Sequence, residues 1–395
     1  MSPEERGRRG PLFGLRVVEI VGIGPAPFCA MLLADLGAEV VKIENPTTGG
    51  DASRGVGPHM LGRGDSQYFQ SFNLNKQSVG LDLSKPQDRE DFHALVGTAD
   101  AVVNNLRGDL PEKLGLDYAH LGTVKPSIVC LHISAYGRDN DRKSWPGYDF
   151  LAQAEAGLMS VTGEPDGPPC RIGVSMIDYM TGLTGAVGLL GCLMRAKTTG
   201  KGCDVDTSLF EVAAHQHAYT GTWHLNTGMV PTRQPRGAHQ SVAPVQTVRT
   251  QDGWIYVMCM KDKFWEILAE RTGRPDLIAD PRFASQAARL ENRDELTTEL
   301  DAAMSAKTTR EWLDVLAGAI PAAPIYDVAE AFTNPFMTAI GMVTSVSHPA
   351  LGDMKVLATP LKLDGERPAK AACPPLGSGN ERYLGQHDGG LRGAA

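Results

Sequence analysis

The stretch that decides the fold runs from Leu15 to Lys42 and reads LRVVEIVGIGPAPFCAMLLADLGAEVVK. Its first part, Leu15 to Ile20, is apolar and β-branched, as buried strands are. A turn of glycine and proline follows at Gly22 to Pro27, and a helical run then extends from Phe28 to Leu36. A second strand-like run, Glu39 to Ile43, completes a βαβ unit.

The same alternation of strand and helix continues through the first half of the chain. Strand-like runs lie at Val79 to Leu83, Ala101 to Val103 and Ile128 to Ile133, with a helical run at Pro86 to Val96. This order favours an α/β fold with an open, mainly parallel sheet covered by helices. Ligands of such sheets bind at the carboxyl ends of the strands. Those ends are Val21 to Pro27, Asp82 to Lys85, Asn104 to Arg107 and Ser134 to Gly137.

The second half of the chain has a different pattern. Val245 to Met258 predicts two short strands, helical runs follow at Lys263 to Arg271 and Gln286 to Ser305, and Val343 to Leu363 predicts one more hairpin. At 395 residues the chain is long enough for two or three domains. We therefore expect a smaller α+β domain after the first.

Composition and charge narrow the class of protein. Basic residues number 38 against 46 acidic ones, a net charge of −8 without any basic run, which argues against a nucleic-acid-binding surface. The seven cysteines include no pair at zinc-ribbon spacing and indicate reduced thiols in a cytoplasmic protein without a bound metal. Met1 to Gly10 lacks the apolar segment of a secretory signal, and the apolar stretch between Asp178 and Arg195 is too short to span a bilayer.

The turn Gly22-Ile-Gly24-Pro-Ala-Pro27 superficially resembles a dinucleotide-binding fingerprint, because it follows a strand and opens a helix. Pro27 stands where the third glycine of that fingerprint belongs, so nicotinamide binding is the least favoured interpretation. Two others stay open. The segment is either a tight turn without a ligand or a loop whose backbone approaches another phosphate-bearing ligand.

Asp178 follows an apolar, strand-like run, Ile172 to Ile177, and precedes a helix. The dipole and free amides of a helix N-cap stabilise a carboxylate as its anion, so Asp178 is expected to be ionised at neutral pH. Most such residues only cap a helix, and that explanation stays open. The chain has no Gly-x-Ser-x-Gly or His-Glu-x-x-His hydrolase motif. The helix carries glycines that allow close approach of another backbone, namely Gly182, Gly185, Gly188 and Gly191.

Several ordered motifs of this chain resemble those of the family III CoA-transferases, the CaiB/BaiF family. The similarity covers Pro11 to Gly385. The resemblance implies a coenzyme A-dependent enzyme with a Rossmann-like large domain, a small domain and an interlocked homodimer. The motifs are Leu15 to Lys42, Pro146 to Asp149, Gly173 to Asp178, Thr199 to Gly202 and Ile320 to Pro324.

The same resemblance predicts the division of the chain into domains. Residues 1–225 form the N-terminal part of the large Rossmann-like, CoA-binding domain. Residues 226–328 form the small α+β domain, and residues 329–395 form a C-terminal segment that returns to the large domain.

In that family an aspartate is acylated by the donor acyl-CoA, and the motif assigns this role to Asp178. The implied product is a mixed anhydride plus CoA, which becomes an aspartyl-CoA thioester that the acceptor acid attacks. Because a carboxylate is already a nucleophile at pH 7, no histidine base is needed. Backbone amides near Asp178 and in the loop at Arg236 are expected to meet the developing oxyanions. The loop residues assigned to the substrate are Gly237, Ala238 and His239, and a purely structural role for His239 stays open.

The resemblance also implies a coenzyme A site. Its residues are Ile23, Gly24, Pro25, Asn45, Leu81, Asp82, Leu83, Ser84, Asn105, Leu106, Arg107, Lys113, Tyr148 and Asp149. Two positions depart from formyl-CoA transferase, because Asn45 replaces an arginine and Ser84 replaces a lysine. Lys42, Lys85 or Lys113 is therefore expected to contact the 3′-phosphate of CoA.

One loop indicates the substrates. Arg236 to Pro244, RGAHQSVAP, is closer to the Ala-His-x-x-x-x-Pro pattern of transferases acting on dicarboxylates than to the four-glycine loop of formyl-CoA transferase. Succinyl-CoA with a second dicarboxylate is therefore the expected pair. Arg171 is either a partner for the distal carboxylate or part of a surface ion pair.

Two other functions stay open. α-Methylacyl-CoA racemases share the N-terminal motif but use Gly-His-Asp, whereas this chain has Gly147-Tyr148-Asp149 and so lacks one acid/base group. A non-catalytic CoA-binding subunit is the second. The preferred function is a cytoplasmic, homodimeric CoA-transferase that acts on an acyl-CoA and a carboxylic acid. No metal, nucleic acid or membrane partner is expected.

Overall fold

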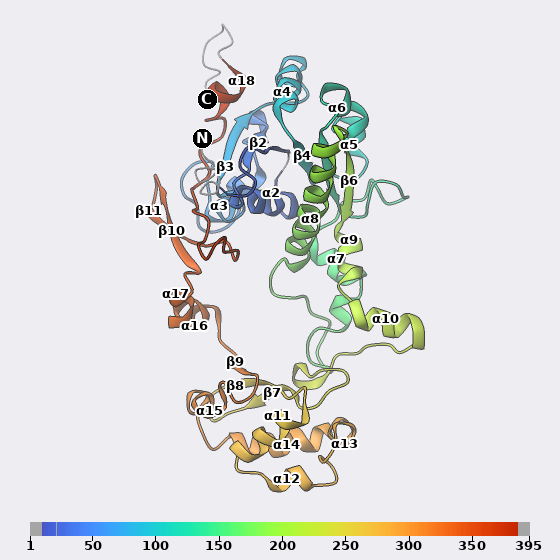
Figure 1. The fold of residues 1–395 in the computed structure, drawn as a ribbon, viewed down its shortest axis with the longest axis vertical. Coiled ribbons are helices and arrows are strands. Elements are labelled where there is room, and N and C mark those ends of the chain that lie inside the picture. Colours follow the sequence, from blue (N-terminus) through green and yellow to red (C-terminus); the bar gives the residue numbers. More distant parts are fainter. Residues whose placement is uncertain (1–9, 21, 386–395) are drawn as a thin grey trace. The chain divides into compact units, whose positions relative to one another are not determined.

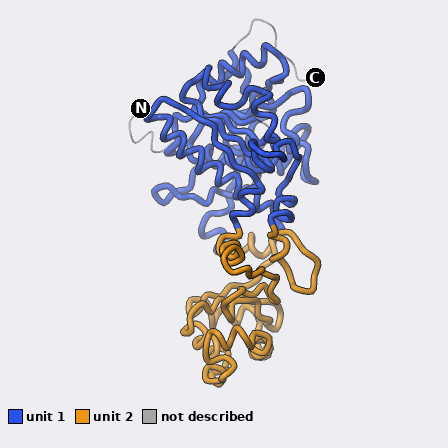
Figure 2. The backbone as a smooth tube through the Cα atoms, turned by 90° about the vertical axis from the view of Figure 1, so that its right-hand side faces the viewer, with its two compact units in different colours: residues 1–156, 173–216, 335–395 blue, residues 157–172, 217–334 orange. Residues whose placement is uncertain are grey.

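The computed structural model describes residues 10–20 and 22–385. Val21 and the N-terminal segment before Gly10 lie outside these ranges. The chain forms two compact units, which Figure 2 distinguishes by colour. The large unit takes its described residues from Met1–Ala156, Gly173–Gln216 and Pro335–Ala395, and the small unit comprises Gly157–Ile172 and His217–Asn334.

A six-stranded sheet forms the centre of the large unit (Figure 1). Its strand order is β3-β2-β1-β4-β5-β6. All of its neighbouring strands are parallel, which confirms the predicted α/β class with a mainly parallel sheet. The strand order reverses between β1 and β4, and doubly wound sheets bind their ligands at that point. The strands are β1 Arg16–Ile20, β2 Glu39–Glu44, β3 Lys76–Gly80, β4 Ala101–Asn104, β5 Val129–Ser134 and β6 Cys203–Ser208.

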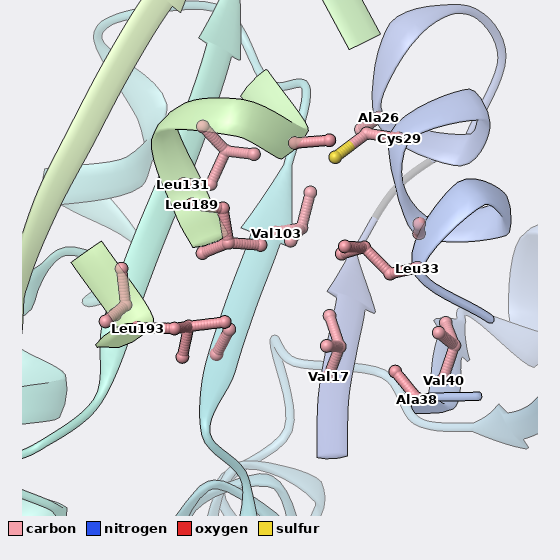
Figure 3. Packing of buried hydrophobic residues seen from close by; sticks show 14 of the residues in the cluster. Val17, Ala26, Cys29, Leu33, Ala38, Val40, Val103, Leu131, Leu189 and Leu193 are labelled. Carbon is pink, nitrogen blue, oxygen red and sulfur yellow. The ribbon is translucent and has the colours of Figure 1, made fainter. Parts of the chain in front are cut away.

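Helices cover both faces of this sheet, which is why its central strands are largely buried and mostly apolar. On one face α2 and α8 pack with β1, β4 and β5, in the cluster of Figure 3 that includes Val17, Leu33, Val103 and Leu189. On the other face α4, α6 and α18 pack around a cluster that contains the buried ring of Phe92. The helices are α2 Pro25–Asp35, α4 Pro86–Thr98, α6 Tyr118–Val124, α8 Met176–Thr199 and α18 Asn380–Leu384.

Shorter elements complete the large unit. The predicted C-terminal hairpin is confirmed as the antiparallel pair β10 and β11. The chain end after this hairpin returns to the sheet, because the side-chain oxygen of Asn380 accepts the Gly80 N–H of β3 at 2.8 Å. These elements are α3 Gln67–Asn73, α5 Leu110–Lys113, α7 Asp149–Glu155, α9 Leu209–His215, α17 Pro335–Ala339, β10 Val343–His348 and β11 Gly352–Leu357.

The small unit is an α+β structure of its own. Its antiparallel sheet has the order β7-β8-β9, and its helices enclose a core that contains Trp265, Phe283 and Trp312. The predicted hairpin at Val245 to Met258 is confirmed as β7 and β8. The elements are α10 Ala218–Thr227, β7 Val245–Arg249, β8 Trp254–Met258, α11 Asp262–Arg271, α12 Asp276–Ala279, α13 Gln286–Glu291, α14 Arg293–Met304, α15 Thr309–Leu316, β9 Ala322–Pro324 and α16 Val328–Thr333.

The segment before α8 differs from the prediction. The strand-like run Ile172 to Ile177 is not a strand, because α8 begins at Met176 and the residues before it lie in bends without a partner strand. α8 is the one described helix that is long and apolar enough, by length and composition, to cross a membrane. Packing on the sheet accounts for only part of that apolar character, because 39% of its most apolar stretch is buried.

Candidate active site

Two neighbouring cavities open at the carboxyl edge of the parallel sheet. The first, about 310 Å³, lies at the point where the strand order reverses between β1 and β4. The second, about 490 Å³, is lined from β2 and from the residues that follow β3. Gly22 and Ile23 line both cavities, so the loop after β1 is their common wall. Ile23 has φ +54, a conformation that a β-branched residue rarely adopts and that is concentrated at functional sites.

All four segments that were predicted to follow strands contribute residues to one or both of these cavities. Asp82 to Lys85 contributes only to the second cavity, and the other three segments contribute to the first. Trp145 and Leu209 also line the first cavity, although the sequence did not single them out. The remaining lining residues are Gly22, Ile23, Gly24, Pro25, Asn105, Leu106, Arg107, Ile133, Ser134, Ala135, Pro146, Gly147, Tyr148 and Asp178.

Asp178 lies in the first turn of α8 and lines the first cavity. A β-carbon at Gly24 would lie 3.3 Å from both of its carboxylate oxygens, and Gly24 has φ +86. Glycine at position 24 therefore satisfies the backbone conformation and leaves room for the carboxylate. Among residues 10–20 and 22–385, no hydrogen bond or ion pair is found to these two oxygens.

The environment of Asp178 differs from the predicted one in two respects. The N-cap of α8 is Ser175, so Asp178 does not cap the helix. Burial and the neighbouring Asp149 carboxylate raise the pKa of Asp178 to about 7. The prediction of an ionised group at neutral pH is therefore wrong, because about half of the carboxyl groups are protonated at pH 7. The favourable helix N-terminus is outweighed by desolvation.

Asp149 connects the start of α7 to the start of α8. Its Oδ2 accepts the backbone N–H of Asp178 at 2.9 Å, and its Oδ1 accepts a hydrogen bond from Gln153. Only 3% of Asp149 is exposed. This carboxylate therefore fixes the backbone of Asp178 and also opposes its ionisation.

Two tyrosines, Tyr68 and Tyr179, lie near enough to Asp178 to feel its charge, and neither was predicted as a site residue. Burial, and next the charge of Asp178, raise the pKa of both Tyr68 and Tyr179. The ring of Tyr179 lies 5.1 Å from that of Phe28 and 6.0 Å from that of Phe72. The nearness of Tyr179 to Asp178 could have been predicted, because the two residues are adjacent in the sequence. Tyr68 lies in α3, far from Asp178 in the sequence, so no local pattern indicated that it would be close.

The second cavity collects a separate group of the predicted CoA residues, namely Asn45, Leu81, Asp82, Leu83 and Ser84. Several of their polar atoms are already bonded. The Oδ1 of Asn45 accepts the Thr47 N–H at 2.9 Å, and the hydroxyl of Ser84 donates to Asp82 at 2.7 Å. Arg89, which the sequence analysis did not consider, also lines this cavity.

The three candidate lysines for a phosphate contact are in different surroundings. Lys42 lines the second cavity, but its fully buried ammonium lies 2.7 Å from Glu19 and 2.8 Å from Asp51. Lys113 lies 2.7 Å from Asp109. Lys85 lies 3.8 Å from Asp82. Neither Lys85 nor Lys113 is among the residues that line the two cavities.

The predicted substrate loop belongs to the small unit. The Tyr256 hydroxyl donates to the Gly237 carbonyl at 2.9 Å, and Arg293 donates to the His239 carbonyl at 2.7 Å. The His239 ring stacks on Tyr219 with a centroid distance of 6.0 Å. Ala238 lies between these two anchored positions, and Arg171 is exposed in another part of the same unit. In the described part of the chain, no group of three His, Cys, Asp or Glu side chains is arranged to hold a metal ion.

Comparisons with known proteins give a consistent result. The family model described as CoA-transferase family III matches residues 12–380. The succinyl-CoA:mesaconate CoA-transferase of Haloarcula hispanica is 34% identical over 93% of this chain and 93% of its own. The acetyl-CoA:oxalate CoA-transferase of Acetobacter aceti is 34% identical over 90% of each chain. The crystal structure of a CAIB/BAIF family protein from Brucella suis has a TM-score of 0.83 at 32% identity and covers 95% of this chain and 98% of its own.

Proposed function

The chain belongs to CoA-transferase family III and acts on acyl-CoA thioesters, and we propose that Asp178 carries the transfer through covalent intermediates. The observation on which this proposal rests is the position of the Asp178 carboxylate. It lines the cavity at the reversal of strand order with a pKa of about 7 and, among the residues that the structure describes, without a hydrogen-bond donor. Such a carboxylate is poorly stabilised as an anion, so its ionised form is a stronger nucleophile than an ordinary surface aspartate.

The transfer proceeds by exchange at carbonyl carbons. An Asp178 oxygen attacks the thioester carbonyl of the donor, the C–S bond breaks, and CoA leaves as a thiolate. The thiolate then attacks the Asp178 carbonyl carbon, which releases the donor acid and leaves an aspartyl-CoA thioester. The acceptor carboxylate attacks this thioester, and a second return of the thiolate yields the new acyl-CoA and free Asp178. No net proton is consumed.

Coenzyme A is proposed to bind along both cavities across the shared loop at Gly22 and Ile23. The Asn105 side chain donates to the Gly22 carbonyl at 3.1 Å and to the Ile23 carbonyl at 2.6 Å. Its Oδ1 is buried and has no partner in the described residues. A buried acceptor of this kind needs a donor, and the amide N–H groups of pantetheine supply one.

A charged cluster beside the first cavity supports a phosphate-bearing ligand. Arg107 and Lys113 both bond to Asp109, at 2.8 Å and 2.7 Å, so the three groups carry a net positive charge. Leu106 and Arg107 line the cavity itself. A CoA diphosphate is suited to this cluster, since the residual charge attracts anions.

The proposed substrates are succinyl-CoA and a second dicarboxylic acid. One relative at 34% identity is named for succinyl-CoA and mesaconate, and another is named for acetyl-CoA and oxalate. In both names the acceptor is a dicarboxylate. The loop Gly237 to His239 is proposed to contact that acceptor, with Arg171 as the candidate partner for its distal carboxylate.

The racemase alternative is disfavoured by the residues around Asp178. Racemisation needs a second group that exchanges a proton with the α-carbon, and Tyr148 occupies the place of the expected histidine. Tyr148 is 69% exposed, so it is not enclosed beside Asp178 as a second acid/base group would be. A non-catalytic subunit is disfavoured by the similarity to relatives that are named as CoA-transferases over nearly the whole chain.

We also propose that the enzyme is a cytoplasmic homodimer. The outward face of α8 exposes the apolar side chains Leu183, Val187 and Met194, to 48%, 73% and 73%. Contiguous apolar side chains on a protein surface mark a protein interface. A second copy of the chain is the partner that the family resemblance implies.

Mass spectrometry of trapped intermediates tests the role of Asp178. The protein is incubated separately with succinyl-CoA, acetyl-CoA and free CoA, quenched, and digested. We expect a CoA-sized adduct on the peptide that contains Asp178 with an acyl-CoA only, and hydroxylamine is expected to remove it. Asp178→Ala is expected to abolish both the adduct and CoA transfer.

The matched control is Asp314→Ala, which removes an exposed carboxylate in the small unit. It is expected to leave adduct and transfer unchanged. An active wild-type enzyme that never modifies the Asp178 peptide, or an Asp178→Ala variant that still transfers CoA, rejects the proposed mechanism.

A further inference from the structure

The acidic groups that line the second cavity are largely neutralised within the protein. Asp51 is paired with Lys42 at 2.8 Å, and Glu44 is paired with Arg54 at 2.7 Å. Asp82 accepts hydrogen bonds from the backbone and side chain of Ser84. The cavity is therefore not simply acidic, although these three carboxylates contribute to its wall.

Its two lining cations differ in their partners. The ammonium of Lys42 is enclosed by Glu19 and Asp51 and has no exposed surface, so it is already neutralised. Arg89, in the first turn of α4, makes no ion pair with any carboxylate in the described residues. Arg89 is therefore the one cation of this cavity whose charge is not neutralised by the protein.

Backbone carbonyls orient the Arg89 guanidinium without neutralising it. Its Nη1 donates to the Leu114 carbonyl at 2.7 Å, and its Nη2 donates to the Leu83 carbonyl at 2.8 Å. A guanidinium has five N–H donors, and these two bonds leave the others for a ligand. Two fixed donors and a half-buried position make the group a preorganised anion contact, since little side-chain freedom remains to be lost on binding.

We infer that Arg89 binds the 3′-phosphate of coenzyme A in the second cavity. This inference rests on the proposed function, because Asp178 fixes the thioester end of CoA in the first cavity. The nucleotide end, which carries the 3′-phosphate, then extends past the shared loop at Gly22 and Ile23 into the second. The contact with the 3′-phosphate, which was predicted for Lys42, Lys85 or Lys113, is thereby assigned to Arg89.

The diphosphate of CoA has the same chemistry as the 3′-phosphate, and 3′-dephospho-CoA distinguishes the two. Calorimetry with CoA and with 3′-dephospho-CoA gives a ratio of dissociation constants for each variant. We expect the wild-type protein to bind 3′-dephospho-CoA about 10-fold or more weakly, the range of one charge-assisted contact. In Arg89→Met the affinity for CoA falls to that for 3′-dephospho-CoA, and the ratio approaches one.

Two further variants control for the loss of the carbonyl contacts. Arg89→Gln retains amide donors without the charge and is expected to lose the preference for CoA as Arg89→Met does. Arg89→Lys retains the charge and is expected to keep part of the preference. Lys85→Met removes a neighbouring, half-exposed cation outside the cavity and is expected to leave the ratio unchanged.

Each contrary outcome has a distinct meaning. If the Arg89 variants weaken both ligands equally, Arg89 contacts the diphosphate or only supports the fold, and the inference is overturned. If Lys85→Met removes the preference for CoA over 3′-dephospho-CoA, Lys85 rather than Arg89 binds the 3′-phosphate, and the inference is overturned. If the wild-type protein binds neither ligand, the proposed function fails before the role of Arg89 is reached.

Discussion

In the proposed mechanism, the ionisation of a single residue, Asp178, controls when the site reacts. Only the carboxylate form attacks a thioester, and burial beside Asp149 raises the pKa of Asp178 to about 7. Because the folded pKa is raised, the nucleophile is lost as the pH falls below 7. We predict that the rate of adduct formation at saturating succinyl-CoA decreases with falling pH. At pH 6 about one-tenth of the Asp178 side chains are ionised.

Rapid-quench measurements between about pH 5.5 and about pH 8.5 check this dependence. The expected curve rises through a single ionisation with its midpoint near 7. A rate that is constant over this range would contradict a nucleophile with a raised pKa.

Asp149→Asn is predicted to move this midpoint to lower pH. The substitution removes the like charge that opposes ionisation of Asp178, and the asparagine Oδ1 still accepts the Asp178 N–H. At pH 6 the variant is therefore expected to form the adduct faster than the wild-type protein. The same rapid-quench series measures the shift.

Asp139→Asn serves as the control, because Asp139 is an exposed acidic residue in the loop between β5 and α7. It is expected to leave the midpoint where it is in the wild-type protein. An unchanged midpoint in Asp149→Asn, or equal shifts in both variants, speaks against a specific effect of Asp149.

A position for Asp178 at a strand-end cavity was predictable, but the environment of its carboxylate was not. Motif resemblance assigned a role to Asp178, which the structure shows in a cavity at a strand end. The opposing carboxylate of Asp149 and the ring of Tyr68 come from other helices. A pKa depends on such three-dimensional neighbours, so a local helix rule gave the wrong ionisation state for Asp178.

At the scale of elements, the contact between α2 and α8 depends on one glycine. A β-carbon at Gly182 would lie 2.8 Å from the Pro25 carbonyl oxygen and 3.2 Å from the Cys29 nitrogen. These are backbone atoms of α2 and cannot rotate away. We predict that Gly182→Ala lowers the free energy of unfolding by about 2 kcal/mol, despite the better helix propensity of alanine.

Gly97 in α4 provides the control, because it lies outside the exposed face of α8. A β-carbon there would meet no atom within 4 Å, so Gly97→Ala is predicted to raise the free energy of unfolding by about 0.5 kcal/mol. Urea unfolding of both variants measures the two changes. If both alanines stabilise the protein, the close approach of α2 and α8 is not required.

The helices and most strands of the sheet were predictable because apolar residues predominate in them. β6, Cys203–Ser208, was missed because two aspartates interrupt its apolar residues and because, within the described residues, it is an edge strand that pairs with β5 alone. The run Ile172 to Ile177 was wrongly predicted as a strand. Its composition suits a strand, but no neighbouring strand pairs with it.

At the scale of the whole molecule, the sequence predicted a mainly parallel sheet and a second, smaller α+β body, and both are present as separate units. The domain limits at 225 and 328 and the interlocked dimer came from the family resemblance and stay predictions. Assembly depends on surfaces whose exposure a sequence does not reveal. α8 illustrates this, because its composition alone does not separate a core-facing side from an exposed one.

The exposed face of α8 leads to the last prediction. Val187 and Met194 are both 73% exposed and lie two helical turns apart on one side of the helix. If a second copy covers this face, charges placed there must be buried without a partner, at a cost of several kcal/mol. We predict that the wild-type protein sediments as a dimer and that the double variant Val187→Glu/Met194→Glu sediments as a monomer with unchanged circular dichroism. Arg310→Glu, which reverses an exposed charge in the small unit, is the control and is expected to remain dimeric. If the double variant is also dimeric, the exposed face of α8 is not the dimer interface.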